Sequence, residues 1–118
     1  MSVTIRKTAG HAAEITWSPK DDPHGYLAHA MESDRLAYAL ESLGGGETET
    51  TPELALQATR HTSALARELE RRAAAQVVAL RDKHGLSWRQ IASVVLEDPE
   101  RQSGVRRMYE SGRRHLGL

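Results

Sequence analysis

The chain contains no cysteine and no phenylalanine, and its aromatic residues are 2 Trp and 3 Tyr. The lack of cysteine excludes a disulfide framework, a thiolate zinc site and a cysteine nucleophile. Leu, Ile and Val together number 22 of the 118 residues, which limits the size of any hydrophobic core, whereas 16 Ala residues favour helix. This length and composition predict one small, mainly helical domain.

Long apolar runs are also missing. No stretch approaches the roughly 20 residues of a membrane span, and residues 1–7 contain no apolar signal region. We therefore expect a cytoplasmic protein that has no membrane partner. Lys is scarce, at 3 of the 16 basic residues, and the excess of Arg together with abundant Ala suggests a GC-rich, bacterial genome.

The net charge is formally zero, because 16 Lys and Arg balance 16 Asp and Glu. These charges are unevenly distributed along the chain. Residues 1–70 carry 6 basic and 11 acidic side chains, whereas residues 71–118 carry 10 basic and 5 acidic ones. Such asymmetry between halves indicates a basic segment that faces a polyanion. The alternative is a solvated basic helix, or one that pairs with the acidic half of its own chain.

Residues that commonly perform catalysis or bind metals are not arranged for either task. The 6 His residues include no pair at the helical spacing of four and no His-Glu-x-x-His run, so no metal site is expected. The adjacent carboxylates at 21–22 and 97–100 suit loops and helix caps better than general acid–base pairs. The glycine run 44–46 lacks the Lys and Ser or Thr of a phosphate loop. We therefore expect neither an enzyme nor a bound cofactor.

The N-terminal segment predicts a short β-hairpin, or a single strand with an arm. Residues 3–8 and 14–17 alternate in polarity and are rich in β-branched types, and the turn-forming residues 9–12 separate them. A first helix is expected to begin at Asp22 and Pro23, as N-cap and first helical residue. Its apolar stripe comprises Leu27, Met31, Leu36, Leu40 and Leu43, and the glycines at 44–46 end it.

The longest predicted helix covers residues 52–84. Thr51 and Pro52 repeat the N-cap and proline signal, and Gly85 occupies the position of a left-handed C-cap. Between them the apolar positions recur mostly at a spacing of four, at Leu54, Ala58, Leu65, Leu69, Ala73, Val77 and Leu80. This stripe serves either as an intramolecular face for the first helix or as the seam of a homodimer.

A short helix follows, which begins at a capping box. The hydroxyl of Ser87 accepts the amide three residues on, and the side chain of Gln90 reaches back to the N-cap. The helix ends near Leu96. Its narrow apolar face, through which it packs on its neighbours, consists of Trp88, Ile91, Ala92 and Val95.

The last predicted helix is capped by Asp98 and Pro99 and runs through Arg101 to about His115. A helix, a Gly-containing turn, a short capped helix and a longer Arg-bearing helix together follow the plan of a helix-turn-helix unit. The expected inward face of the last helix consists of Val105, Met108, Tyr109, Gly112 and Leu116.

The outer residues of that last helix suit a DNA major groove, because the fork of Arg matches both phosphate oxygens and the O6 and N7 atoms of guanine. Arg101 lies near the start of the helix, and Gln102, Arg106 and Arg113 share one face at spacings of four and seven. We assign the base edges to Arg101, Gln102 and Arg106. The phosphate contacts are assigned to Ser87, through the amides freed near it, and to Arg89, Arg107, Arg113 and Arg114.

The segment Leu80–Ala92 (LRDKHGLSWRQIA) resembles the first two helices of small bacterial helix-turn-helix proteins similar to region four of sigma factors, usually written L-R-x-x-x-G-L-S-W-x-x-I-A. The segment Arg101–Tyr109 (RQSGVRRMY) resembles their recognition helix, S-R-Q-A-A-x-x-R-Y. The likeness covers roughly residues 73–110 and implies that the helix opening with Arg-Gln lies in the major groove. The sequence departs from that pattern in a longer acidic turn at 97–100, and in Ser103-Gly104 where the family has two Ala residues.

These observations divide the chain into an N-terminal arm (1–20), a helical scaffold or dimerisation region (21–72) and a helix-turn-helix (73–118), within a single compact domain. The leading hypothesis is a sequence-specific double-stranded DNA-binding protein that regulates transcription. The alternative is a helical interaction module in which the helix-turn-helix is degenerate and the basic helix binds an acidic protein surface.

Overall fold

The computed structural model describes residues 2–41 and 51–118. These residues form two strands and five helices: β1 (Thr4–Ala9), β2 (Ala12–Thr16), α1 (Tyr26–Glu32), α2 (Arg35–Leu40), α3 (Pro52–Asp82), α4 (Trp88–Val95) and α5 (Gln102–His115). The mainly helical class with a small N-terminal sheet is thereby confirmed. The predicted positions of Leu43 and the glycine run 44–46 lie outside the described residues.

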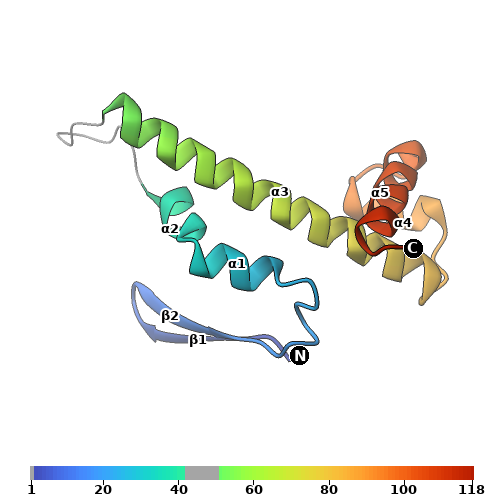
Figure 1. Cartoon of the computed structure of the whole chain (residues 1–118). Helices are drawn as coiled ribbons and strands as arrows, with labels where there is room; N and C mark the ends of the chain where they lie inside the picture. Colours follow the sequence, from blue (N-terminus) through green and yellow to red (C-terminus); the bar gives the residue numbers. More distant parts are fainter. Residues whose placement is uncertain (1, 42–50) are drawn as a thin grey trace.

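The molecule is elongated along α3 (Figure 1). Its extents are 51 × 30 × 28 Å and its radius of gyration is 17.4 Å, whereas a compact chain of this length has a radius of gyration of about 13–14 Å. Helices α1 and α2 lie along the N-terminal half of α3, and α4 and α5 gather at its C-terminal end (Figure 1). One long helix therefore carries two separate packed groups.

The predicted hairpin forms as a two-stranded antiparallel sheet. Ile5 pairs with Ile15, and Arg6 pairs with Glu14 across the strands, where the Arg6 Nη2 donates to Glu14 Oε2 at 2.6 Å. Every residue of both strands is exposed. Within the described residues neither strand packs against a helix, so the hairpin adds nothing to the core.

The first helix differs from its prediction at both ends. It begins at Tyr26 instead of Pro23, because Gly25 adopts the left-handed conformation (φ 70°) that precedes it. The carboxylate of Asp22 accepts from the backbone N–H of Ala28 at 3.0 Å, so it caps the helix from a distance and is not the N-cap itself. The single helix predicted up to the glycines at 44–46 is interrupted within the described residues, since Asp34 is also left-handed (φ 57°) and is the N-cap of a second helix, α2.

Helix α3 begins as predicted and ends at Asp82, two residues before the predicted end at 84. The side chain of Thr51 accepts from the backbone N–H of Leu54 at 3.2 Å, and Pro52 is the first helical residue. At the other end, Gly85 is left-handed (φ 63°) and turns the chain back. The Leu86 N–H then donates to the carbonyl oxygen of Leu80 at 3.1 Å. No break occurs over the 31 residues between these signals.

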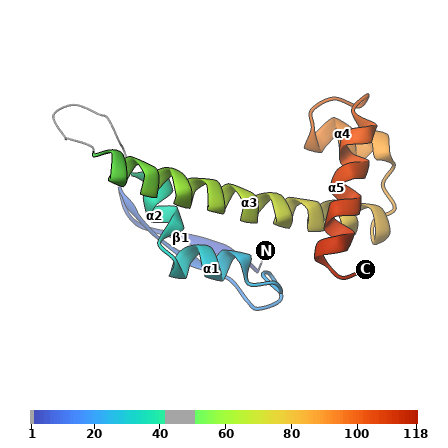
Figure 2. The same ribbon diagram turned by 45° about the horizontal axis from the view of Figure 1, so that its top comes forward.

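The C-terminal group has a small apolar core. Val77, Ile91, Ala92 and Val105 are buried, and Met108 and Tyr109 pack against them, as predicted. Helix α5 crosses α3 steeply (Figure 2), and the crossing is close because Gly112 has no side chain to hold the backbone of Ala74 away.

The start of α5 differs from the prediction that Asp98 and Pro99 cap it. The helix begins at Gln102 with Arg101 as N-cap, and no side chain caps its first turn. Asp98 Oδ1 instead accepts from the backbone N–H of Glu100 at 2.9 Å, within a turn where Glu97 is left-handed (φ 56°). The acidic segment is thus a separate turn between α4 and α5.

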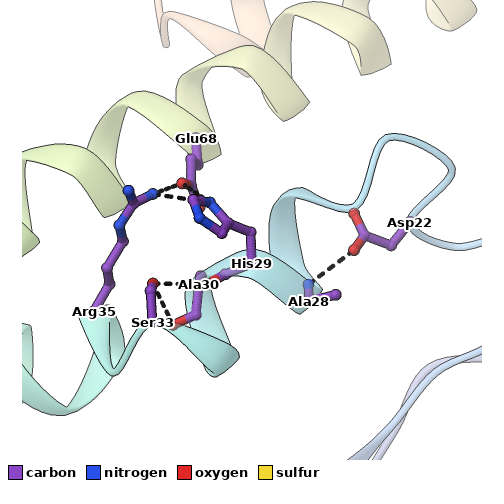
Figure 3. Close-up of polar contacts among 7 residues, drawn as sticks. All are labelled: Asp22, Ala28, His29, Ala30, Ser33, Arg35 and Glu68. Atoms are coloured by element: carbon purple, nitrogen blue, oxygen red, sulfur yellow. Dashed lines mark hydrogen bonds and ion pairs between the residues drawn. The ribbon is translucent and has the colours of Figure 1, made fainter.

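Buried ionic contacts join the N-terminal group to α3. The carboxylate of Glu68 on α3 is buried and points at His29 of α1 and Arg35 of α2 (Figure 3), with 3.0 Å between Glu68 Oε1 and His29 Nδ1. The buried carboxylate of Asp22 receives Arg72 of α3 at 3.2 Å. These pairs fix the direction in which α1 and α2 lie along α3.

Candidate nucleic-acid interface

The N-terminus of α4 has the predicted capping box. The Ser87 hydroxyl accepts from the Gln90 N–H at 3.1 Å, and Gln90 Oε1 accepts from the Ser87 N–H at 2.8 Å. Both polar groups of Ser87 are therefore engaged within the cap. In the part of the chain that the structure describes, the amides of Trp88 and Arg89 have no acceptor, so they are the ones that remain for an anion.

The outer face of α5 is basic. Val105 and Gly112 are buried against α3 and α4. Arg107 and Arg114 each follow one of them by two residues, which is about 200° around a helix, so they project from the opposite side. Among residues 2–41 and 51–118, no ion pair is made by Arg101, Arg106, Arg107 or Arg114.

Arg106 lies over an aromatic ring of the neighbouring helix. Its Cζ is 5.5 Å from the centroid of the Trp88 ring, and the Cζ of Arg81 on α3 is 4.4 Å from the same centroid. The ring of Tyr109 meets Trp88 edge-on, with 5.2 Å between the centroids. Cation–π contacts of this kind hold a guanidinium without neutralising it, so the charge of Arg106 stays available beside the start of α4.

Arg113 lies against α3 and not on the outermost face. Its Nη1 donates to the hydroxyl of Tyr109 at 3.3 Å, and that hydroxyl donates to Asp82 Oδ1 at 2.7 Å. Asp82 Oδ2 also lies 3.9 Å from Arg113 Nη1. The hydrogen bond and charge of Tyr109, followed by the charge of Asp82, raise the pKa of Arg113. This residue, predicted as a phosphate contact, therefore also ties α5 to α3.

Arg89, another predicted phosphate contact, is paired with the acidic turn. Its Nη1 lies 2.6 Å from Glu100 Oε1, and both side chains are well exposed. An exposed pair of this kind contributes at most about 1 kcal/mol, so Arg89 can exchange Glu100 for another anion at small cost. The turn at 97–100 nevertheless brings negative charge to the side of α4 on which Arg89 lies.

Sequence reasoning did not identify the roles of Arg81 and Asp82 at the end of α3. Arg81 stacks on Trp88 across the turn, and Asp82 holds Tyr109 of α5. The spacing of four between Tyr109 and Arg113 was a readable signal for their contact. The contact between Asp82 and Tyr109 depends on the angle at which α5 crosses α3, and no local pattern reveals that angle.

In the portion of the chain described, no three His, Asp or Glu side chains gather as a metal site. Its helices include none that combines the length and the apolarity needed to cross a membrane. Comparison of the chain with known protein families, with curated proteins and with solved structures finds no match.

Proposed function

We propose that the chain is a sequence-specific double-stranded DNA-binding protein that regulates transcription in the bacterial cytoplasm, with α5 in the major groove. The observation that carries this proposal is the basic outer face of α5. Arg107 and Arg114 on that face make no ion pair with the described residues, and neither do Arg101 at the N-cap and Arg106 beside Trp88.

Helix α5 belongs to a helix-turn-helix unit, which holds it in place. The end of α3, the short α4 and the longer α5 share one buried core around Ile91 and Val105, so α5 is held by its inner face and its outer face is left for a partner. A B-DNA major groove is about 12 Å wide and admits one α-helix. Arginines that have no carboxylate partner can bind DNA phosphates and so release the counterions held there. This release is the main source of affinity for DNA.

The contacts divide by position on α5. Arg101, Gln102 and Arg106 lie at its first turns, and we assign them to base edges. Arg107 and Arg114 are seven residues apart on the outermost face, which suits phosphates on the groove walls. The free amides at the start of α4, with Arg89 beside them, suit a further phosphate.

A homodimer through α3 is part of the same proposal. Leu54 and Leu69 on α3 are 41% and 53% exposed, although they belong to its apolar stripe. A two-fold dimer would present two copies of α5 to successive major grooves, and a single helix-turn-helix gains affinity and site length from such pairing.

The proposal is tested by titrating random-sequence duplex DNA with the protein over a series of salt concentrations. Log K should fall linearly with log salt, by close to one unit of slope for each phosphate contacted. The double variant Arg107→Ala/Arg114→Ala should lower that slope by about two. Arg60→Ala/Arg71→Ala, two exposed arginines on α3, should leave it unchanged. Absence of binding at low salt contradicts the proposal.

A second candidate is supported by the pair between Arg89 and Glu100. Glu100 of the acidic turn already binds Arg89, and an acidic segment of another protein could take the place of Glu100 there. In that case poly-glutamate should bind the protein while duplex DNA at an equal total concentration of negative charge should not, and Arg107→Ala/Arg114→Ala should weaken the poly-glutamate complex.

A further inference from the structure

A cleft of about 450 Å³ lies between the two packed groups of the molecule. One wall is the loop that precedes α1, the floor is the C-terminal third of α3, and the other wall is the chain end that follows α5. Its volume lies within the range of small-molecule sites. None of the residues assigned to DNA lines it.

The floor and one wall of the cleft are apolar. Ala75 and Ala79 of α3 contribute the floor, and Leu116 and Leu118 contribute the C-terminal wall. Gly117 is left-handed (φ 74°), and the N–H groups of Gly117 and Leu118 donate to the carbonyls of Arg114 and Arg113 at 3.1 and 2.8 Å. This turn holds Leu118 at the cleft, where it remains 66% exposed.

The carboxylates around the cleft are already engaged. Asp22 is held by Arg72 and by the Ala28 amide, and Asp82 is held by Tyr109. Asp21 accepts from Ser2 and from the backbone N–H of Ser18, and these hydrogen bonds lower its pKa. Each of the three thus has a partner of its own, and Asp22 and Asp82 each have an arginine partner, Arg72 and Arg113.

The lysines around the cleft are different. Lys20 and Lys83 both line it and both are exposed, and within residues 2–41 and 51–118 neither makes an ion pair. The chain has only one other lysine, Lys7, in the hairpin. Two ammonium groups without an ion-pair partner among the described residues thus stand beside the apolar side chains of the cleft.

We propose that this cleft binds a small amphipathic anion, whose apolar body lies on α3 against Leu116 and Leu118 and whose carboxylate meets Lys20 and Lys83. Apolar lining with a few convergent polar groups is the usual make-up of such a site. The site goes beyond the proposed DNA binding and does not depend on it. Because a ligand there would touch both the loop before α1 and the end of α5, it would join the two packed groups.

The test is titration calorimetry of the full chain, without DNA, using decanoate as the anionic probe and decyltrimethylammonium as its cationic counterpart. Decanoate should bind at one site and decyltrimethylammonium should not. Lys20→Glu/Lys83→Glu and, separately, Leu118→Asp should each weaken decanoate binding about tenfold or more, since each removes one kind of contact.

Matched controls are Lys7→Glu for the charge and Leu56→Asp, at another exposed leucine, for the apolar contact. Both should bind decanoate like the parent chain, and circular dichroism should show all variants folded. Equal binding of the two probes, no binding of decanoate at millimolar concentration, or equal loss in the control variants would overturn the proposal. Sedimentation showing that Leu118→Asp converts a dimer to a monomer, with no decanoate bound, would assign the cleft to a second copy and overturn it as well.

Discussion

Gly112 of α5 meets the backbone of Ala74 of α3 so closely that a Cβ at position 112 would overlap the Ala74 carbonyl group. The helix crossing therefore depends on the absence of a single side chain. Gly112→Ala should lower the free energy of unfolding by about 2 kcal/mol, because the backbones must separate, even though Ala favours helix. Urea denaturation measures this change.

Gly104 provides the matched comparison for that prediction. It lies in the same helix, and a Cβ there would meet only the side chain of Leu96, 2.7 Å from its Cδ1. A leucine side chain can move aside, so Gly104→Ala should change the free energy of unfolding little, the helix-propensity gain of roughly 1 kcal/mol offsetting the crowding. Equal destabilisation by the two substitutions would contradict the claim that the close approach of Gly112 to the Ala74 backbone sets the cost.

The buried carboxylate of Glu68 gives the second prediction. Arg35→Ala removes its guanidinium partner and leaves a buried negative charge with only His29 beside it. The loss should be about 3 kcal/mol in urea denaturation. Adding Glu68→Gln to Arg35→Ala should recover much of that loss. The exposed neighbour Arg67→Ala should change stability by less than about 0.5 kcal/mol.

The pH dependence of stability gives the third prediction. Hydrogen bonds from Ser2 and from the Ser18 amide lower the pKa of Asp21 in the folded chain. A carboxyl group whose folded pKa is depressed stabilises the fold above its unfolded pKa of about 3.9, and this contribution is lost as the pH falls through the folded pKa. Carbon NMR titration should place the Asp21 pKa below the ordinary value, and Ser2→Ala should raise it towards that value.

The division of labour on α5 gives the fourth prediction, which rests on the proposed DNA binding. Arg106→Ala should flatten the sequence preference, because a bidentate contact to a base is worth about 1–3 kcal/mol of discrimination. Arg114→Ala should weaken all sequences alike and lower the salt slope by about one. Selection from a random duplex pool, followed by titration of the selected and a scrambled site, separates the two effects. Identical behaviour of the two variants would refute the assignment.

The acidic turn gives the fifth prediction. Glu100→Gln removes the partner of Arg89 and one negative charge beside α4. If α4 approaches a phosphate, the variant should bind duplex DNA more tightly at low salt and raise the salt slope by about one. Glu70→Gln, an exposed acid on α3, is the control and should have no effect on the slope.

Local chemistry made the helix boundaries at Thr51, Gly85 and Ser87 predictable, because each depends on hydrogen bonds within a few residues. The start of α1 was not predictable in the same way. Asp22 looks like an N-cap in sequence, yet its carboxylate lies between Ala28 and Arg72, and Arg72 is 50 positions away. The ion pair with Arg72 therefore holds Asp22 away from the N-cap position that the local sequence pattern predicted for it.

The candidate interface was predictable to a similar extent. The inward residues Val105 and Gly112 follow from periodicity, and the outward direction of Arg107 and Arg114 follows from them. The position of Arg106 over Trp88 depends on how α5 packs against α4, and that of Arg113 against Asp82 depends on how α5 crosses α3. Sequence spacing placed Arg106 and Arg113 on one face but could not tell which neighbour that face would meet.

Helix α3 acts mechanically as a lever. Its 31 residues span about 46 Å, so a tilt of one degree at the end that carries α1 and α2 would move the other end by about 0.8 Å. Because a displacement of about 1 Å is enough to break a hydrogen bond, a few degrees at the N-terminal group would take the arginines of α5 out of register with a DNA groove. The rigidity of a single unbroken helix thus converts small angular changes at one end into translations at the other.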